Sequence, residues 1–207
     1  NIGEDQDLII RTYLTGSVRH INKGLYLQRM HSNSATQRAY SKAVESTNIL
    51  YARHINDIVL RWCELEGLPH YNFSVGFNPE PRWDNIDTLT GSVDFTKRWP
   101  WDDSSIGAFR LFDILEHMPN KMHAVSEIHR CLVPGGWALT HTPSALGRGA
   151  FQDPSHCSYW VENSFRYVTE RGLANFISNK LVRFQALRLV EDLPYEIING
   201  VVRQSRY

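Results

Sequence analysis

Three polar residues, His156, His141 and Asp113, have the chemistry of a general base and stand next to predicted strands. An imidazole or a carboxylate takes the proton of a hydroxyl nucleophile, whereas an amine only has to arrive unprotonated. His156 ends the segment Asp153–His156, where a nearby carboxylate would orient the imidazole ring. A structural role is the alternative for both histidines, His156 as a pin for its loop and His141 as a pocket wall. These three residues are the candidate catalytic groups.

A second set of residues is suited to a nucleotide-like ligand. Gly76 follows a predicted strand and allows the backbone to approach a ligand closely. Asp87 follows the next strand, at the position that binds ribose hydroxyls in dinucleotide sites. Asp94 and Phe95 place a hydrogen-bond acceptor beside an aromatic face, as an adenine requires. Taken singly, each has an ordinary alternative, namely a turn glycine, a turn-capping aspartate, and a loop aspartate beside a core phenylalanine.

The sequence predicts no metal site. The three cysteines, Cys63, Cys131 and Cys157, are far apart and have neither metal-ligand spacing nor a plausible disulfide framework. The nine histidines are scattered, and the Asp102-Asp103 pair could mimic a paired-carboxylate site. We expect reduced, mostly buried thiols, as in a cytoplasmic protein.

The charge balance argues against a polymeric nucleic acid as partner. The chain has 22 basic and 22 acidic residues, and a nucleic-acid binder usually has a basic excess because phosphate neutralisation supplies most of its affinity. No apolar run reaches the roughly 18 residues that a membrane span needs, and no signal peptide is recognisable. We expect no nucleic-acid partner, no membrane association and a cytoplasmic location.

The first third of the chain has helical periodicity. We expect one or two helices over residues 5–30, broken near Gly16 and Gly24, and a long amphipathic helix over residues 34–66. Ser34 and Gln37 form a capping box at its start, and Gly67 is a natural residue to end it. The apolar stripe of this helix predicts a packing face against the core or against a second subunit, so a homodimer through the N-terminal helices is one expectation. The stripe consists of Tyr40, Val44, Thr47, Tyr51, Ile55, Ile58, Trp62 and Leu65.

Strands and helices alternate after Pro69. We expect strands over residues 70–75, 84–87, 108–112 and 137–142, helices over 122–132 and 162–177, and a turn at 134–136. Two further strands, 182–190 and 195–203, are predicted to form an antiparallel hairpin. The pattern predicts an α/β fold with a mainly parallel sheet. Residues 1–67 would form a helical cap or appendage, and residues 68–207 the core.

Several ordered motifs resemble class I S-adenosylmethionine-dependent methyltransferases of the type 11 kind. Residues 71–87, YNFSVGFNPEPRWDNID, are similar to the pattern L-x-L-G-C-G-x-x-P-x-x-G-W-x-N-V-D. Matches to later motifs follow in the same order, at Asp94–Thr96, Trp99–Ser105, Ile114–Pro119, Glu127–Gly136, Asp153–His156 and Trp160–Phe165. The chain departs from the pattern in the first loop, where Ser74 replaces a glycine and Val75 a cysteine, and Arg82 stands where a glycine is common.

The resemblance implies a Rossmann-like fold and S-adenosylmethionine as cofactor. Ser74 and Gly76 would flank its methionine part, Asp87 would accept from the ribose hydroxyls, and Asp94 would accept the adenine amino group. Phe95 would pack nearby, and Phe112 would line the pocket near the methyl group.

We therefore expect a methyltransferase acting on oxygen or nitrogen of a small molecule, such as a secondary metabolite, a sugar or an amino-acid-like acceptor. Much of the acceptor pocket is expected to consist of Trp99, Trp101, Tyr159, Trp160 and the N-terminal helices. The alternative is a non-catalytic, methyltransferase-like binding or assembly module with a degenerate cofactor loop. Ser74 discriminates between the two, because restoring glycine should help a weakened cofactor site and do little for a scaffold.

Overall fold

The computed structural model describes residues 4–16, 18, 40–74, 79–87, 93–178, 184–191, 195–198 and 201–204. The chain divides into two compact units, Asn1–Gly67 and Leu68–Tyr207. The predicted break near Gly24, the predicted helix start at Ser34 and the loop glycine Gly76 lie outside the described residues.

The first unit contains two described helices, α1 (Glu4–Thr15) and α3 (Tyr40–Glu66). Helix α1 ends before Gly16, as predicted. Gly67 follows α3 with φ of +64°, a left-handed conformation that ends a helix and costs glycine little. Among the described residues of the predicted stripe, Ile55, Ile58 and Trp62 are half-buried and Leu65 is exposed. The fully buried residues of this stretch are Val59, Leu60 and Cys63. No described helix has the length and apolar character needed to cross a membrane.

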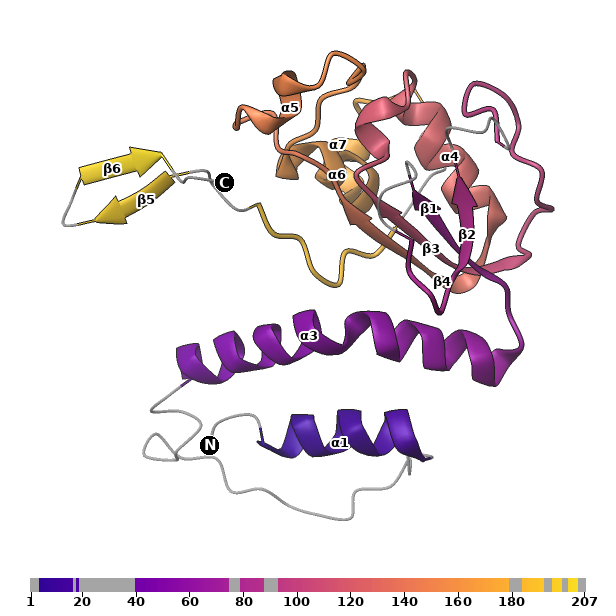
Figure 1. The fold of residues 1–207 in the computed structure, drawn as a ribbon, viewed down its shortest axis with the longest axis vertical. Coiled ribbons are helices and arrows are strands. Elements are labelled where there is room, and N and C mark those ends of the chain that lie inside the picture. Colours follow the sequence, from indigo (N-terminus) through magenta and orange to yellow (C-terminus); the bar gives the residue numbers. More distant parts are fainter. Residues whose placement is uncertain are drawn as a thin grey trace. The chain divides into compact units, whose positions relative to one another are not determined.

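The second unit is built on a sheet of four parallel strands in the order β2-β1-β3-β4 (Figure 1). The strands are β1 (His70–Ser74), β2 (Asp84–Asp87), β3 (Ile106–Phe112) and β4 (Leu132–His141). Strand β3 lies in the interior of the sheet and its first six residues are all buried. The prediction of an α/β fold with a parallel sheet is confirmed.

Strand β4 begins five residues earlier than predicted and runs through Pro134-Gly135-Gly136, which the sequence indicated as a turn. Gly135 has φ of +84°, and the register with β3 shifts between Ile106 and Ala108. A Cβ on Gly136 would lie 2.9 Å from the carbonyl oxygen of Val133. The two glycines therefore allow an irregular strand where most sequences would turn.

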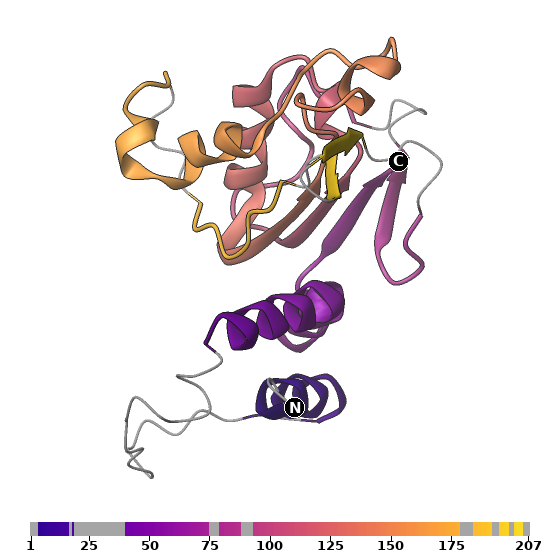
Figure 2. The same cartoon turned by 90° about the vertical axis from the view of Figure 1, so that its left-hand side faces the viewer.

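Helix α4 (Lys121–Cys131) packs on one face of the sheet (Figure 2). The side chain of Asn120 caps it by accepting the backbone N–H of His123 at 3.0 Å. The core of this unit contains a cluster of aromatic rings, in which Phe73 contacts those of Phe95, Trp99, Trp101 and Phe109. This core holds the strands in register and so positions their carboxyl ends.

The C-terminal third departs most from the sequence prediction. The expected helix over 162–177 is two helices, α6 (Glu162–Thr169) and α7 (Arg171–Ala174), because Glu170 between them is extended, with φ −112° and ψ 126°. The predicted strand 182–190 is wrong over the described residues 184–191, which contain no strand. Instead β5 (Tyr195–Ile198) and β6 (Val201–Gln204) pair antiparallel in a separate two-stranded sheet.

Two of the three thiols are buried, as expected. Burial raises the pKa of Cys63 and of Cys131 to about 11, so both are poor nucleophiles at neutral pH. Cys157 is exposed.

Candidate functional site

The carboxyl ends of the four parallel strands lie at one edge of the sheet, where open α/β folds bind their ligands. Ser74 at the end of β1 is the register partner of Asp87 at the end of β2. Phe112 at the end of β3 is the register partner of His141 at the end of β4. Four predicted site residues, one from each strand, therefore share this edge. Of the two predicted first-loop positions, Ser74 is placed by its backbone, and Gly76 lies outside the described residues.

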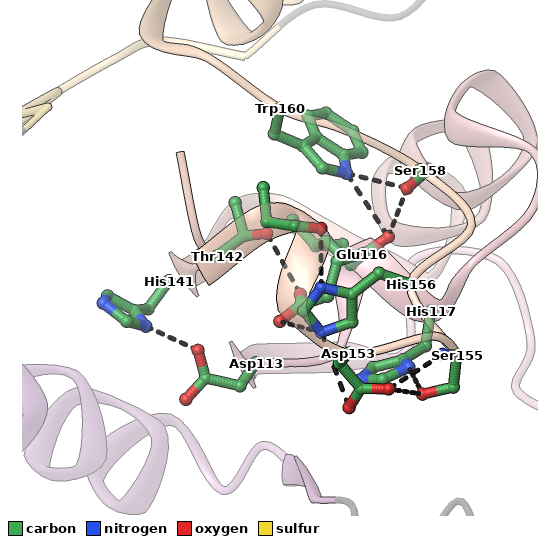
Figure 3. A network of polar contacts seen from close by, with 12 residues as sticks. Asp113, Glu116, His117, His141, Thr142, Asp153, Ser155, His156, Ser158 and Trp160 are labelled. Atoms are coloured by element: carbon green, nitrogen blue, oxygen red, sulfur yellow. Dashed lines mark hydrogen bonds and ion pairs between the residues drawn. The ribbon is translucent and has the colours of Figure 1, made fainter. Parts of the chain in front are cut away.

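Asp113 and His141 form a pair at this edge. The Asp113 carboxylate lies 2.9 Å from Nδ1 of His141, and the backbone N–H of Asp113 donates to the His141 carbonyl oxygen, also at 2.9 Å (Figure 3). Both side chains are about half exposed or more. A carboxylate on Nδ1 fixes the proton there and makes Nε2 the nitrogen that takes a proton, as in a catalytic dyad.

The backbone of Asp113 is in the left-handed region, with φ of +53°. A residue with a side chain adopts this conformation at a cost, and such residues gather at functional sites. The conformation turns the chain out of β3 into the 3₁₀-helix η1 (Leu115–His117) and leaves the carboxylate beside β4.

A chain of polar side chains, buried at Arg110 and Asn72, lies behind this edge, and sequence reasoning missed it. Nη1 of Arg110 donates to Oδ1 of Asn72 at 2.7 Å, and Nδ2 of Asn72 donates to Asn85 at 2.8 Å. The guanidinium carbon of Arg110 lies 3.9 Å from the ring centroid of Phe112, which in turn contacts the ring of His141. Burial lowers the pKa of Arg110. The only signal in the sequence was an arginine within an apolar strand, which marks a buried, partnered cation.

Asp94 and Phe95 have local roles. The Asp94 carboxylate accepts from Lys97 Nζ at 2.8 Å and from the backbone N–H and hydroxyl of Thr96 at 3.0 and 2.6 Å. These hydrogen bonds, led by that of Lys97, hold the pKa of Asp94 well below its usual range. The ring of Phe95 packs against those of Phe73 and Trp99. The predicted adenine acceptor thus already has turn partners, and its aromatic neighbour belongs to the core.

His156 lies in a different environment from the Asp113–His141 pair. Its side chain is 7% exposed, Nδ1 lies 3.0 Å from the carbonyl oxygen of Ala150, and Nε2 faces Oε1 of Glu116 at 3.9 Å (Figure 3). The other carboxylate oxygen of Glu116 accepts from the hydroxyl of Thr142, the residue after β4, at 3.0 Å. His156 therefore stands behind the strand ends, in contact with the elements that follow them.

The loop that carries His156 is fastened to η1 by its backbone. The carbonyl oxygen of Glu116 accepts from the N–H groups of Cys157 and Ser158, both at 2.9 Å. The carbonyl oxygen of Leu115 accepts from the hydroxyl of Ser158 at 2.8 Å and from the indole N–H of Trp160 at 3.3 Å. The Leu115–His117 motif and the Asp153–His156 motif are thus parts of one assembly.

The motif that includes Glu127 and Arg130 fastens another loop. The buried Glu127 carboxylate accepts from the backbone N–H of Trp99 at 2.7 Å and from Arg130 at 2.6 Å. Arg130 also donates to the carbonyl oxygens of Trp99 and Trp101. This motif positions the segment 99–101 against the core.

Two of the four predicted acceptor-pocket aromatics are core residues. Trp99 and Trp160 are 1% and 2% exposed, so their prediction as pocket walls is wrong. Tyr159 is exposed and stacks on exposed Phe151, with centroids 4.8 Å apart. Phe151 and Tyr159 therefore present a stacked aromatic surface to solvent.

Comparison with known proteins gives one match. Residues 78–140, which include β2, β3, α4 and most of β4, match the family described as a methyltransferase domain. Searches of curated proteins and of solved structures each gave no match.

Proposed function

We propose, from the match of residues 78–140 to the methyltransferase domain family, that the chain is a class I S-adenosylmethionine-dependent methyltransferase and methylates an oxygen or nitrogen atom of a small-molecule acceptor. The observation that carries the proposal is the Asp113–His141 pair, with 2.9 Å between carboxylate and Nδ1, at the carboxyl edge of the sheet. The family accounts for the methyl donor, and the pair would supply a base at the edge of the sheet where open α/β folds bind their ligands.

The residues at the sheet edge fit the cofactor. Asp87 ends β2 directly beside Ser74 of β1, which is where a doubly wound fold holds ribose hydroxyls. Phe112 ends β3 on the same edge, and its ring contacts both Arg110 and His141. Asp87 would hold the ribose and Phe112 would border the reacting centre. When bound, S-adenosylmethionine supplies a methyl group already activated by its sulfonium.

The chain's own part in the reaction is positioning and proton removal. With Nδ1 held by Asp113, Nε2 of His141 would accept the proton of the acceptor hydroxyl as that oxygen takes up the methyl group that the cofactor supplies when bound. The Asp113 carboxylate would stabilise the imidazolium that this proton transfer leaves. For an amine acceptor the same base takes up the proton released after transfer.

A small acceptor is favoured by two features. The net charge is zero, so the chain lacks the basic excess of proteins that hold nucleic acids. The exposed Phe151–Tyr159 stack offers a flat aromatic face of the size of a sugar or a single ring. Secondary metabolites, sugars and amino-acid-like compounds are the proposed acceptors.

Calorimetric titration of the chain with S-adenosylmethionine and S-adenosylhomocysteine tests the proposal. Asp87→Ala should weaken binding about 10- to 150-fold, because a lost hydrogen bond to a charged group costs about 1.5–3 kcal/mol. Asp84→Ala, at the exposed start of the same strand, is the matched control and should bind as the unaltered chain does. Absence of binding at millimolar cofactor would refute the enzyme and favour a binding module. Equal losses in both variants would refute the role of Asp87.

A further inference from the structure

Three ligand-type side chains come together behind the strand ends, although the sequence predicted no metal site. One ligand atom from each of Glu116, His117 and His156 lies within 4.8 Å of the others. Glu116 and His117 belong to η1, which follows β3, and His156 belongs to the segment that follows β4. The cluster is therefore made by the fold and is not a local sequence motif (Figure 3).

The hydrogen bonds of His156 aim a lone pair into the cluster. Nδ1 lies 3.0 Å from the carbonyl oxygen of Ala150, which can only accept, so Nδ1 carries the proton. The neutral ring then has its lone pair on Nε2, and that atom faces Oε1 of Glu116 and Oδ2 of Asp153, each at 3.9 Å. These distances are too long for hydrogen bonds. In this tautomer Nε2 of His156 therefore faces two carboxylate oxygens without a hydrogen between them.

Hydrogen bonds fix the tautomer of His117 as well. The hydroxyl of Ser155 donates to the Asp153 carboxylate at 2.6 Å, so its oxygen accepts from Nδ1 of His117 at 3.2 Å. This assignment leaves the lone pair of His117 on Nε2. Metal-bound histidines in proteins usually donate their other ring N–H to a carbonyl or carboxylate group, as His156 does directly and His117 does through Ser155.

Glu116 supplies the charge. Its side chain is 2% exposed, and Oε1 has no hydrogen-bond partner among the described residues, while Oε2 accepts from Thr142. A buried carboxylate oxygen without a donor is costly, and a cation is one of the few groups that offsets that cost.

We propose that Glu116, His117 and His156 bind a divalent first-row transition metal ion, with Zn²⁺ as the best-fitting probe. Two imidazoles and one carboxylate are a known ligand set for zinc with an open fourth position, and imidazole ligands disfavour Mg²⁺. Ligand atoms of tetrahedral zinc lie about 3.4 Å apart at bond lengths of about 2.0–2.2 Å. The 3.9 Å between Nε2 of His156 and Oε1 of Glu116 must close by about half an ångström, and the widest separation in the cluster, at most 4.8 Å, by about 1.4 Å. Asp153 or water would complete the site.

Metal-binding measurements on chelator-treated protein test this proposal without cofactor or acceptor, so its outcome is independent of methyl transfer. We expect one equivalent of Zn²⁺ to bind, millimolar Mg²⁺ not to compete, and Co²⁺ to give the visible bands of a low-coordinate imidazole site. Glu116→Gln and His156→Gln should abolish stoichiometric binding. His129→Gln, which removes an exposed histidine of α4, is the matched control and should bind normally.

Ser155→Ala keeps the test valid if Glu116→Gln and His156→Gln, which alter buried side chains, fail to fold. Ser155 is exposed and contacts the site only through His117 and Asp153, so its loss should weaken Zn²⁺ binding about 10- to 100-fold with the thermal midpoint of the metal-free protein unchanged. Absence of stoichiometric binding would overturn the proposal. So would full affinity in both Ser155→Ala and Glu116→Gln, or loss of binding on Cys157→Ser alone, because the ion would then be bound elsewhere.

Discussion

Replacing Asp113 by glycine and by alanine separates the chemical role of its carboxylate from the conformation of its backbone. Both variants lose the partner of His141 Nδ1, so the imidazole is free to adopt the wrong tautomer or orientation. Loss of the acid in an Asp–His pair costs on the order of 10²–10⁴ in turnover. We expect both variants to lose this much methyl-transfer activity.

The two variants should differ in stability. The left-handed backbone at φ +53° costs a residue with a Cβ roughly 1–2 kcal/mol, and glycine escapes this cost but loses about 0.5–1 kcal/mol in chain entropy. The Asp113–His141 pair is more than half exposed, so its loss costs at most about 1 kcal/mol. Asp113→Gly should therefore unfold within about 1 kcal/mol of the unaltered chain. Asp113→Ala should be about 1 kcal/mol less stable than Asp113→Gly.

Urea unfolding and release of S-adenosylhomocysteine measure the two effects separately. Equal stability of the alanine and glycine variants would refute the left-handed backbone at Asp113. Near-normal turnover in either variant would refute the dyad, and would move the search for a base to His156.

Two further predictions concern the fold. Burial acts to raise the pKa of Glu127, but hydrogen bonds from Arg130 and from the backbone N–H of Trp99 bring this pKa below its ordinary 4.5. The stability that the Glu127 carboxylate contributes is therefore present above about pH 4.5. It is lost as the pH falls through the lower pKa that Glu127 has in the folded state. Glu127→Gln should lower the free energy of unfolding by about 1.5–3 kcal/mol at neutral pH, and urea unfolding should show a weaker dependence of stability on acid pH. An unchanged pH dependence of stability would contradict this role of Glu127. Gly136→Ala should cost about 1–3 kcal/mol in the same assay, since its Cβ would lie 2.9 and 3.0 Å from two backbone carbonyl oxygens, whereas Gly172→Ala meets nothing within 4 Å and should not destabilise. Equal effects of the two alanines would count against the close strand contact.

The central strands could be predicted because local sequence determines them. Strand β3 is buried on both faces and reads as an almost continuous apolar run, and the observed strand differs from the predicted one only at its start. The start of β4 was missed because Pro-Gly-Gly is ordinarily a turn. Here the left-handed Gly135 and the Cβ-free Gly136 let the strand pass close to β3, and nothing in the local pattern distinguishes that case.

The break between α6 and α7 depends on contacts that periodicity cannot show. Helical spacing continues through Glu170, yet the N–H of Phe184 donates to the carbonyl oxygen of Val168 at 2.9 Å, in the last turn of α6. A distant segment thus satisfies a carbonyl group that a continuing helix would have used. The same segment was predicted as a strand, and Glu191 at its end accepts from the hydroxyl of Ser144 instead of pairing with a strand.

The candidate bases were recognisable one by one, but their grouping was not. Asp113 and His141 are 28 residues apart, and they meet because β3 and β4 are neighbours in register. Strand order is not readable from a single sequence. For the same reason Glu116 and His156 looked like separate motifs, although the backbone of η1 joins them.

The left-handed turn at Asp113 links the two sites and also allows them to be separated. It directs the Asp113 carboxylate toward β4, and it starts η1 at the angle that buries Glu116 beside His156. Glycine adopts the same backbone without strain, so Asp113→Gly removes the base pair but preserves the path of the chain into η1. Because the metal ligands depend on that path and not on the carboxylate, Zn²⁺ affinity should survive in the glycine variant while turnover falls. A joint loss would mean that Asp113 itself is a ligand, and the two sites would be one.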